Sequence, residues 1–296
     1  MPRISSNSGL RKPIAVCCAS AAFACALVAL WPAAAAEDRS APNFSPDSST
    51  GWIAMGQEFL PPPSGPGPIT ADPAHVRKPD GQPAFRVADL ANPILQPWVR
   101  EELRKANERA LSGKAAYTPK ERCWPIGVPG FLLYPVFPVY FVQTPKEVVM
   151  IWAEDHQVRR VYLNQQHSAR VTPSWFGESV GRYEGDTLVV DTLGLNARTY
   201  VDNYRTPHTD KLHVVERFRM IDGGKTMEVQ VHVEDPGAFT TPWDAIQRYR
   251  RIDGAGSATD PRVPRGPLEE MACAENNGDR FNEGLEPIPQ ADKPDF

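Results

Sequence analysis

The sequence predicts a mainly β protein, built around an antiparallel barrel of about eight strands with one helix before it. Two observations lead to this prediction. Between residues 139 and 252, short runs of alternating apolar and polar residues follow one another and are separated by turn residues. The connections between these runs are mostly short, which favours antiparallel pairing of neighbouring strands. An antiparallel sheet of about eight strands can close into a barrel that holds one small ligand.

The helix is expected over residues 97–111, and the strands follow it in order. Pro97 suits the first turn of a helix, and Val99, Leu103 and Ala110 recur at helical spacing. We expect strands over residues 139–143, 147–154, 158–164, 179–183, 187–192, 212–221, 226–234 and 244–252. A barrel of this kind would be similar to lipocalins and calycins, and an open two-sheet sandwich is the alternative.

The first 36 residues have the features of a secretory signal peptide. Arg3, Arg11 and Lys12 precede an apolar run, Ile14–Trp31, and a series of alanines ends at Ala36. We therefore expect cleavage after Ala36 and a periplasmic or secreted protein without membrane contact. An uncleaved membrane anchor is the alternative, because the apolar run is close to the shortest length that spans a bilayer.

The rest of the chain divides into three parts by composition. Residues 37–90 are rich in Pro and Gly and are expected to form an irregular arm. Residues 91–253 hold the helix and the barrel, and residues 254–296 form an irregular tail that we expect to pack on the barrel.

Composition and export exclude several classes of function. Removal of the leader leaves 260 residues with a net charge of −7, because the leader has three basic and no acidic residues. An acidic chain without a basic run is a poor candidate for binding nucleic acid or anionic membranes. Export also argues against ATP, NAD and coenzyme A chemistry, so we expect no cofactor.

Two of the five cysteines, Cys123 and Cys273, lie outside the leader. In an exported chain they predict one disulfide, and a metal site is the less favoured alternative because neither lies in a CxxC or Cys/His cluster. No metal is expected. A zinc site made by His167, His208 and a glutamate stays open, although these residues lack short-range metal spacing.

Several motifs resemble those of a large family of exported bacterial proteins, which is mostly uncharacterised. They are RCWPIGVP at 122–129, VQTP at 142–145, RRVYL at 159–163, GESVGRYEGDTLVVDT at 177–192, LHVVERF at 212–218, EDP at 234–236 and TPW at 241–243. The resemblance covers roughly residues 90–275 and implies no catalytic assignment. The chain is less closely similar to exported decarboxylases that act on carboxylates of lignin-derived phenolic dimers.

The chain departs from this family pattern in three places. Residues 164–169 (NQQHSA) keep the histidine of a family Asp-Gly-Arg-x-His-Pro stretch but not its frame. Tyr183 stands where the family usually has Trp, and Thr209 where it usually has Ser. A changed pocket loop implies a changed substrate.

Candidate acid–base groups come from the strand pattern and the loops. Glu154 and Glu216 fall on otherwise apolar strand faces, where a carboxyl must be paired, protonated or near water. Tyr162 is a candidate for holding or deprotonating a phenol. His167 and His208 lie in loops at strand ends, where site residues are common. We interpret these five as the candidate catalytic residues.

Candidate substrate-binding residues are Arg160, Arg217 and Trp152. An arginine can hold a carboxylate through two hydrogen bonds, and Trp152 shares an inward face with Val148 and Met150. Structural roles stay open for two of the candidates. Arg217, on the strand face opposite to that of Glu216, would belong to a surface ion pair, and Glu216 would form a buried ion pair with Arg160.

Other polar features argue for simpler roles. His156, His213 and His232 are expected on solvated turns or faces. The GxSxG spacing at 177–181 continues into a strand, so it lacks the strand–turn–helix context of a hydrolase nucleophile. Walker, HExxH and CxxC motifs are missing from the sequence.

Two functions from different classes fit these residues. The first is a cofactor-independent lyase or isomerase, most concretely a decarboxylase of a small phenolic carboxylate in aromatic compound catabolism, which works by acid–base chemistry. The second is a non-catalytic, lipocalin-like binding protein for an apolar or aromatic ligand in the periplasm.

Overall fold

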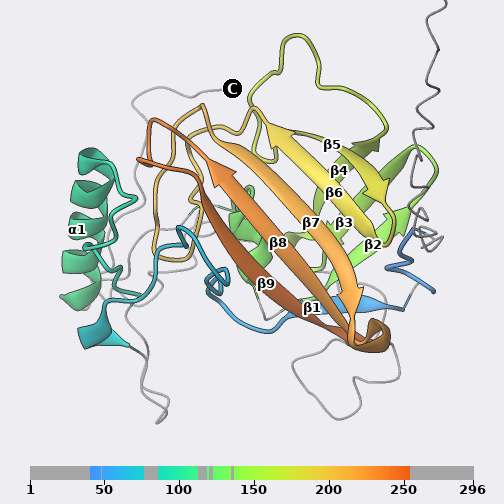
Figure 1. Cartoon of the computed structure of the whole chain (residues 1–296), viewed down its shortest axis with the longest axis horizontal. Helices are drawn as coiled ribbons and strands as arrows, with labels where there is room; N and C mark the ends of the chain where they lie inside the picture. The colour runs from blue at the N-terminus through green and yellow to red at the C-terminus, as the bar shows by residue number, and fades with distance from the viewer. Residues whose placement is uncertain are drawn as a thin grey trace, which may run out of the picture. The chain divides into compact units, whose positions relative to one another are not determined.

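The computed structural model describes residues 41–47, 49–76, 86–112, 119, 123–134 and 137–253. Within them, nine strands close into a barrel in chain order, and the last strand pairs with the first (Figure 1). The strands are β1 (Gly51–Ala54), β2 (Val139–Gln143), β3 (Glu147–Trp152), β4 (Gln157–Leu163), β5 (Glu178–Glu184), β6 (Thr187–Leu193), β7 (His213–Ile221), β8 (Thr226–Glu234) and β9 (Trp243–Ile252).

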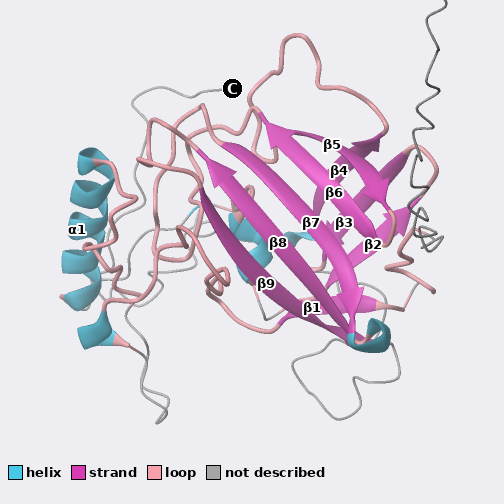
Figure 2. Cartoon of the chain, in the orientation of Figure 1, coloured by secondary structure: helices cyan, strands magenta, loops and turns pink. Residues whose placement is uncertain are grey.

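One α-helix and four short 3-10 helices accompany the strands in the described residues. They are α1 (Pro97–Leu111), η1 (Pro73–His75), η3 (Gly130–Leu133), η4 (Glu154–His156) and η5 (Asp222–Gly224). Figure 2 shows α1 apart from the strands of the barrel. None of the described helices is long and apolar enough to span a membrane.

The predicted β-barrel is confirmed, and each expected strand agrees with the observed one to within two residues. Two details of the prediction were wrong. The barrel has nine strands, and β4 pairs with β5 in parallel, with Val161 beside Ser179. The connection between these strands, residues 164–177, is named the crossover loop here. A parallel pair needs such a long connection, because the chain must return to the end from which the first strand started.

The ninth strand, β1, comes from the arm that was expected to be irregular. Trp52 pairs with Val139 of β2 and with Arg251 of β9, so β1 closes the barrel. The Trp52 side chain is fully buried, and its Nε1 donates a hydrogen bond to the carbonyl oxygen of Phe44 at 2.9 Å. Burial of this large ring fixes a short strand that local propensity alone would not predict.

Alternation along β3 and β7 places the expected side chains inside the barrel. Val148, Met150 and Trp152 are buried on β3, and Val214 and Phe218 are buried on β7. These side chains form part of one continuous core with the aromatic rings of the arm. The interior of the barrel is therefore a packed core.

The face of β4 that carries the candidate residues Arg160 and Tyr162 points outward, so neither side chain faces the interior of the barrel. Gln157, Arg159 and Val161 occupy the inward positions instead. Asp155 and His156 take left-handed conformations, with φ of 55° and 49°, in the turn before β4. This turn starts β4 at Gln157 and so determines which side chains face the core.

The helix is confirmed with its expected limits. Val99, Leu103 and Ala110 are buried, and Asn107 exchanges two hydrogen bonds with the backbone of Ala88. The leader at residues 1–36, the tail at 254–296 and Cys273 lie outside the described residues. Signal cleavage, the packing of the tail and the Cys123–Cys273 disulfide stay predictions.

Candidate functional site

A surface pocket of about 510 Å³ lies on the outer side of β4, and we name it the β4 pocket. Strand alternation brings Val158, Arg160 and Tyr162 to one wall. The end of the crossover loop supplies Trp175 and Phe176. The pocket thus combines an apolar wall, a cation and a phenol, the features of a site for a small aromatic anion.

Arg160 presents hydrogen-bond donors to this pocket. Its Nε and Nη2 donate to Oε2 of Glu147 at 3.1 and 2.8 Å, and this pairing raises the pKa of the guanidinium. Nη1 makes no hydrogen bond to the described residues, and the side chain is 56% exposed. The guanidinium also lies over the Tyr162 ring, 5.8 Å from its centroid.

Aromatic packing holds the crossover-loop wall. The ring of Trp175 lies 5.1 Å from that of Trp124, and Phe176 packs edge-on against Phe131 at 6.3 Å. Gly177 follows with a φ of +64°, where a Cβ atom would overlap the carbonyl oxygen of Leu193. The sequence therefore needs glycine here to bring the loop this close to β6.

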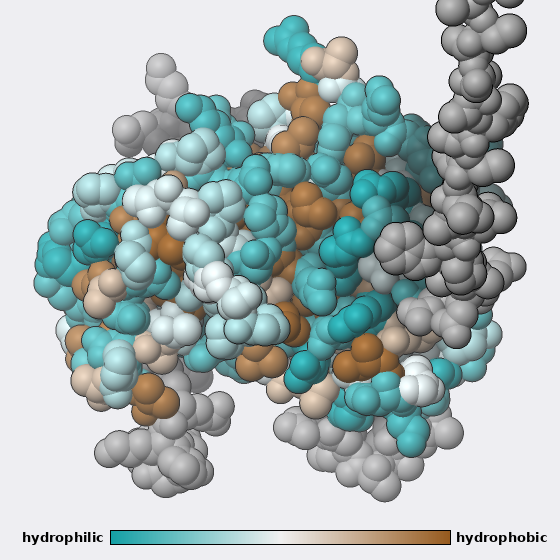
Figure 3. Space-filling view, in the orientation of Figure 1, coloured by the Kyte–Doolittle hydropathy of each residue, from teal (hydrophilic) through white to brown (hydrophobic). Residues whose placement is uncertain are grey.

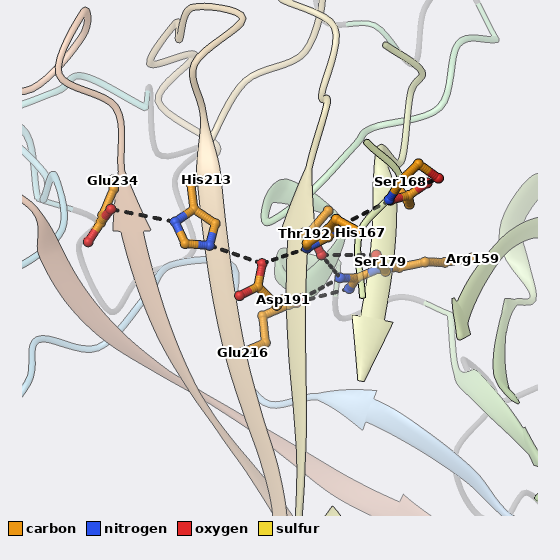
Figure 4. Close-up of polar contacts among 10 residues, drawn as sticks. Arg159, His167, Ser168, Ser179, Asp191, Thr192, His213, Glu216 and Glu234 are labelled. Atoms are coloured by element: carbon orange, nitrogen blue, oxygen red, sulfur yellow. Dashed lines mark hydrogen bonds and ion pairs between the residues drawn. The ribbon is translucent and has the colours of Figure 1, made fainter. Parts of the chain in front are cut away.

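Inside the barrel, Arg159 and Glu216 form a buried ion pair (Figure 4). Arg159 Nη1 donates to Glu216 Oε1 at 3.0 Å, Nη2 donates to Oε2, and Nη2 also donates to Thr192 at 2.8 Å. The Ser179 hydroxyl accepts from Nε at 3.2 Å. Glu216 was expected to pair with Arg160 or to face a site. Its partner is Arg159, and its carboxylate is fully occupied away from the β4 pocket.

The cavity beside this ion pair is very small. It has a volume of about 10 Å³ and is bounded by Phe131, Met150, Trp152, Arg159 and Phe176, among others. That volume holds about one water molecule. Trp152 points into this packed region, where its Nε1 donates to Phe137, so it does not line the β4 pocket.

A row of histidines and carboxylates crosses the outer side of the sheet. We call it the histidine ladder, and it comprises Glu178, His167, Asp191, His213, Glu234, His232 and Asp244. Figure 4 shows part of it, with Glu234, His213, Asp191 and His167 in succession. Each histidine lies between two carboxylates. His213 and His232 lie on outward, partly exposed faces as expected, but the sequence did not predict their carboxylate partners.

The ladder shifts the pKa values of its members in opposite directions. The hydrogen bond with Asp191 raises the pKa of His213, and the same contact lowers the pKa of Asp191. Burial opposes protonation of His232, but hydrogen bonds with Glu234 and Asp244 leave its pKa raised. Hydrogen bonds from Ser168 lower the pKa of Glu178. All these shifts favour the charged forms.

Other outward charges on the sheet are paired as well. Glu184 accepts from Arg182 and from Arg217, which confirms that Arg217 belongs to a surface ion pair. Glu228 accepts from Arg219 and Arg248. Figure 3 shows this side of the molecule as mostly hydrophilic, with small groups of apolar side chains between.

His208 is 3% exposed and lies apart from the residues that line the β4 pocket. Its Nδ1 lies 2.8 Å from the carbonyl oxygen of Thr209, which can only accept, so Nδ1 carries the proton. Nε2 then accepts from the Thr199 hydroxyl at 2.9 Å. Burial lowers the pKa of His208. This geometry holds a neutral imidazole within the structure.

The structure thus brings together only some of the candidate residues. Arg160 and Tyr162 share the β4 pocket with Cys123, and His167 lies on the crossover loop that forms one wall of it. Glu216, Trp152, His208 and Arg217 lie elsewhere, and the side chain of Glu154 is outside the described residues.

The sequence reasoning missed Trp175, Phe176 and Asp191. The first two stand in a turn between Pro173 and Gly177, a position that signals an exposed aromatic loop. Asp191 lies on the outer face of an apolar strand, which gave no sign of its histidine neighbours.

In the described part of the chain, no group of three or more His, Cys, Asp or Glu residues is arranged to hold a metal ion. Comparisons with protein-family models, curated proteins and solved structures give no match for this chain. Its function is therefore inferred from the geometry of the β4 pocket.

Proposed function

We propose that the protein binds a small aromatic carboxylate in the β4 pocket and decarboxylates it by acid–base chemistry without a cofactor. The observation that carries this proposal is the position of Arg160 and Tyr162, side by side on the β4 wall of a pocket whose crossover-loop wall includes Trp175 and Phe176. The expected export of the chain belongs to the same proposal and places the reaction outside the cytoplasm.

The pocket offers a contact for each part of such a ligand. The donors of Arg160 Nη1, which make no hydrogen bond within the described part of the chain, suit the carboxylate. A charge-assisted hydrogen bond of this kind contributes about 1.5–3 kcal/mol. The rings of Trp175 and Phe176 suit the aromatic part, since aromatic pairs add about 0.5–1.5 kcal/mol beyond their buried area. Tyr162 is left to hydrogen-bond a phenolic oxygen.

The proposed reaction balances for a para-hydroxyaryl acid whose carboxyl group is conjugated with the ring. The phenol loses its proton while the carbon next to the carboxylate gains one, which gives a quinone-methide-like intermediate. The bond to the carboxylate carbon then breaks, carbon dioxide leaves, and the electron pair returns through the ring to the phenolic oxygen, which regains a proton. Tyr162 would hold that oxygen, and Glu154, which precedes the pocket residue Asp155, is the proposed proton donor to carbon.

The test is a binding and turnover assay with a panel of phenolic carboxylic acids, without added metal or cofactor. Arg160→Met is expected to raise Kd about 10–100-fold, because one charge-assisted contact is lost. Arg182→Met is the matched control: Arg182 is also an exposed, outward strand arginine paired with a glutamate, at 58% against 56% exposure for Arg160. Loss of carbon dioxide from a bound acid, detected by mass spectrometry, supports the lyase.

A binding protein without catalysis is the second candidate, and the exposure of Arg160 favours it. A half-exposed arginine at an open pocket leaves water in contact with the ligand, whereas catalysis usually requires water to be excluded. Bound acids that are recovered unchanged would support this second function. Absence of binding to wild type would contradict both.

A further inference from the structure

The crossover loop is attached to the histidine ladder at one end and forms a wall of the β4 pocket at the other. His167 and Ser168 lie near its start, and Ser174, Trp175 and Phe176 line the pocket near its end. The loop connects two parallel strands, so hairpin geometry does not fix its path. Its contacts with the outer face of the barrel must therefore fix that path.

Two residues of the loop make four contacts with the barrel, and a third residue contacts the segment that follows β6. His167 Nδ1 lies 3.1 Å from Glu178 Oε1, and its Nε2 lies 2.9 Å from Asp191 Oδ1. The backbone N–H of Ser168 donates to Glu178 Oε1 at 2.7 Å, and its hydroxyl donates to Glu178 Oε2 at 2.6 Å. Farther along, the N–H of Ser174 donates to the carbonyl oxygen of Gly194 at 3.0 Å.

His213 holds the other side of Asp191. Its Nε2 lies 3.0 Å from the same Oδ1 atom that His167 contacts, and its Nδ1 lies 3.5 Å from Glu234 Oε2. A carboxylate oxygen only accepts, so an imidazole between two carboxylates satisfies both contacts only when both ring nitrogens carry protons. Asp191 is thus fixed by a positive partner from β7 while it holds the loop.

We propose that Asp191 and His213 are positioning residues of the β4 pocket, which act through His167 to hold the crossover loop and its aromatic wall in the binding geometry. Neither residue lines the pocket. The inference rests on the proposed function only for its effect on ligand affinity, because the position of the loop is measurable without ligand.

The arrangement makes the attachment of the loop depend on pH. The charged groups that face the two histidines nearest the loop are Glu178 from β5, Asp191 from β6 and Glu234 from β8; His232 and Asp244 continue the row. Because the pKa of His213 is raised above 6.5, its contribution is complete below that pH and is lost as pH rises through the raised value. The contribution of Asp191 is lost only as pH falls below its ordinary value of 3.8.

The test is hydrogen–deuterium exchange of the full chain between pH 5.5 and 8.5, corrected for the intrinsic rate at each pH. In wild type we expect protection of the Ser168 and Ser174 amides to fall within this range, as pH rises through the raised pKa of His213. Asp191→Asn and His213→Asn should lower this protection about tenfold or more and flatten its pH profile. Asp222→Asn, in the exposed turn between β7 and β8, is the control.

Each result decides the inference. Wild-type protection and a wild-type pH profile in both variants would overturn it. Unchanged exchange in β8 shows that a variant is folded. If both variants unfold, the pH profile of the wild-type protein is the test. Loop protection that stays constant up to pH 8.5 in wild type contradicts the inference. Ligand affinity is a second measurement: Asp191→Asn should weaken binding of an aromatic acid at pH 6 more than at pH 8. Absence of binding to wild type would count against the proposed function alone.

Discussion

Arg159 of β4 and Glu216 of β7 reach each other across the barrel interior and form a two-pronged ion pair that is 2% and 0% exposed. The hydroxyls of Ser179 and Thr192 accept the remaining contacts of the guanidinium. The Cζ atom of Arg159 lies over the Phe131 ring, 4.9 Å from its centroid. In a buried ion pair, the attraction between the two charges offsets the cost of removing them from water. Removal of one partner leaves the other charge buried without compensation and destabilises the fold.

The first prediction removes one partner of this pair. Glu216→Gln leaves Arg159 buried without a counter-charge, so the free energy of unfolding should fall by about 3–5 kcal/mol. Urea denaturation monitored by circular dichroism measures this change. Glu184→Gln, which breaks a surface pair with Arg217, should cost less than about 1 kcal/mol. Equal losses in the two variants would show that Glu216 is not the required partner of Arg159.

The identity of the buried arginine shows where sequence reasoning stopped. The need for a partner of Glu216 followed from the apolar face around it. The run Val158-Arg159-Arg160-Val161 does not state which arginine faces inward, because each has an apolar residue on its own face. The left-handed turn at Asp155 and His156 determines which side chains of β4 face inward. A positive φ at two residues that are not glycine cannot be predicted from the sequence.

The strands themselves were predictable because their apolar alternation is local. β1 and the parallel β4–β5 pair were not, since both depend on contacts between residues far apart in the chain. The alternation of β3 and β7 predicted the core, whereas the β4 pocket depends on where the crossover loop returns. Trp175 and Tyr162 therefore line the same pocket only because the fold brings them there.

The second prediction tests closure of the barrel by β1. Trp52→Ala removes a fully buried ring that lies at the junction of β1, β2 and β9, so unfolding should become easier by about 3–5 kcal/mol. Met55→Ala, just after the same strand and 62% exposed, should stay within about 0.5 kcal/mol of wild type. Denaturant titrations of both variants make the comparison. A small loss for Trp52→Ala would mean that β1 contributes little to barrel stability.

The third prediction concerns His208 and acid. Its folded pKa lies below the ordinary value of 6.5, so the unfolded chain takes up the proton first and stability falls as pH drops below 6.5. The slope for one such group is at most about 1.4 kcal/mol per pH unit. His213 and His232 have raised pKa values in the folded protein, so their stabilising contributions are lost as pH rises above 6.5.

Thermal or urea denaturation between pH 5 and 7 measures this effect. His208→Gln should flatten the fall in stability between pH 6.5 and 5, whatever its effect on stability at pH 7. Met55→Ala, at an exposed residue that does not titrate, should leave the slope unchanged. An unchanged slope in His208→Gln would assign the acid sensitivity to another group.

The final prediction separates backbone strain from crowding at the pocket. Gly177 and Gly223 share a φ of +64°, but a Cβ at Gly177 would overlap the Leu193 carbonyl oxygen, and one at Gly223 would meet nothing within 4 Å. Alanine at either site costs about 1–2 kcal/mol for the left-handed backbone. Gly177→Ala must also move the crossover loop away from β6, so its loss of stability should be clearly larger.

Because Gly177 lines the β4 pocket, the same variant should weaken binding of an aromatic acid, whereas Gly223→Ala should bind like wild type. Equal stability losses in the two variants would show that the crossover loop can move away from β6 without a loss of free energy. The close approach of Gly177 to Leu193 would then not be what keeps the loop rigid.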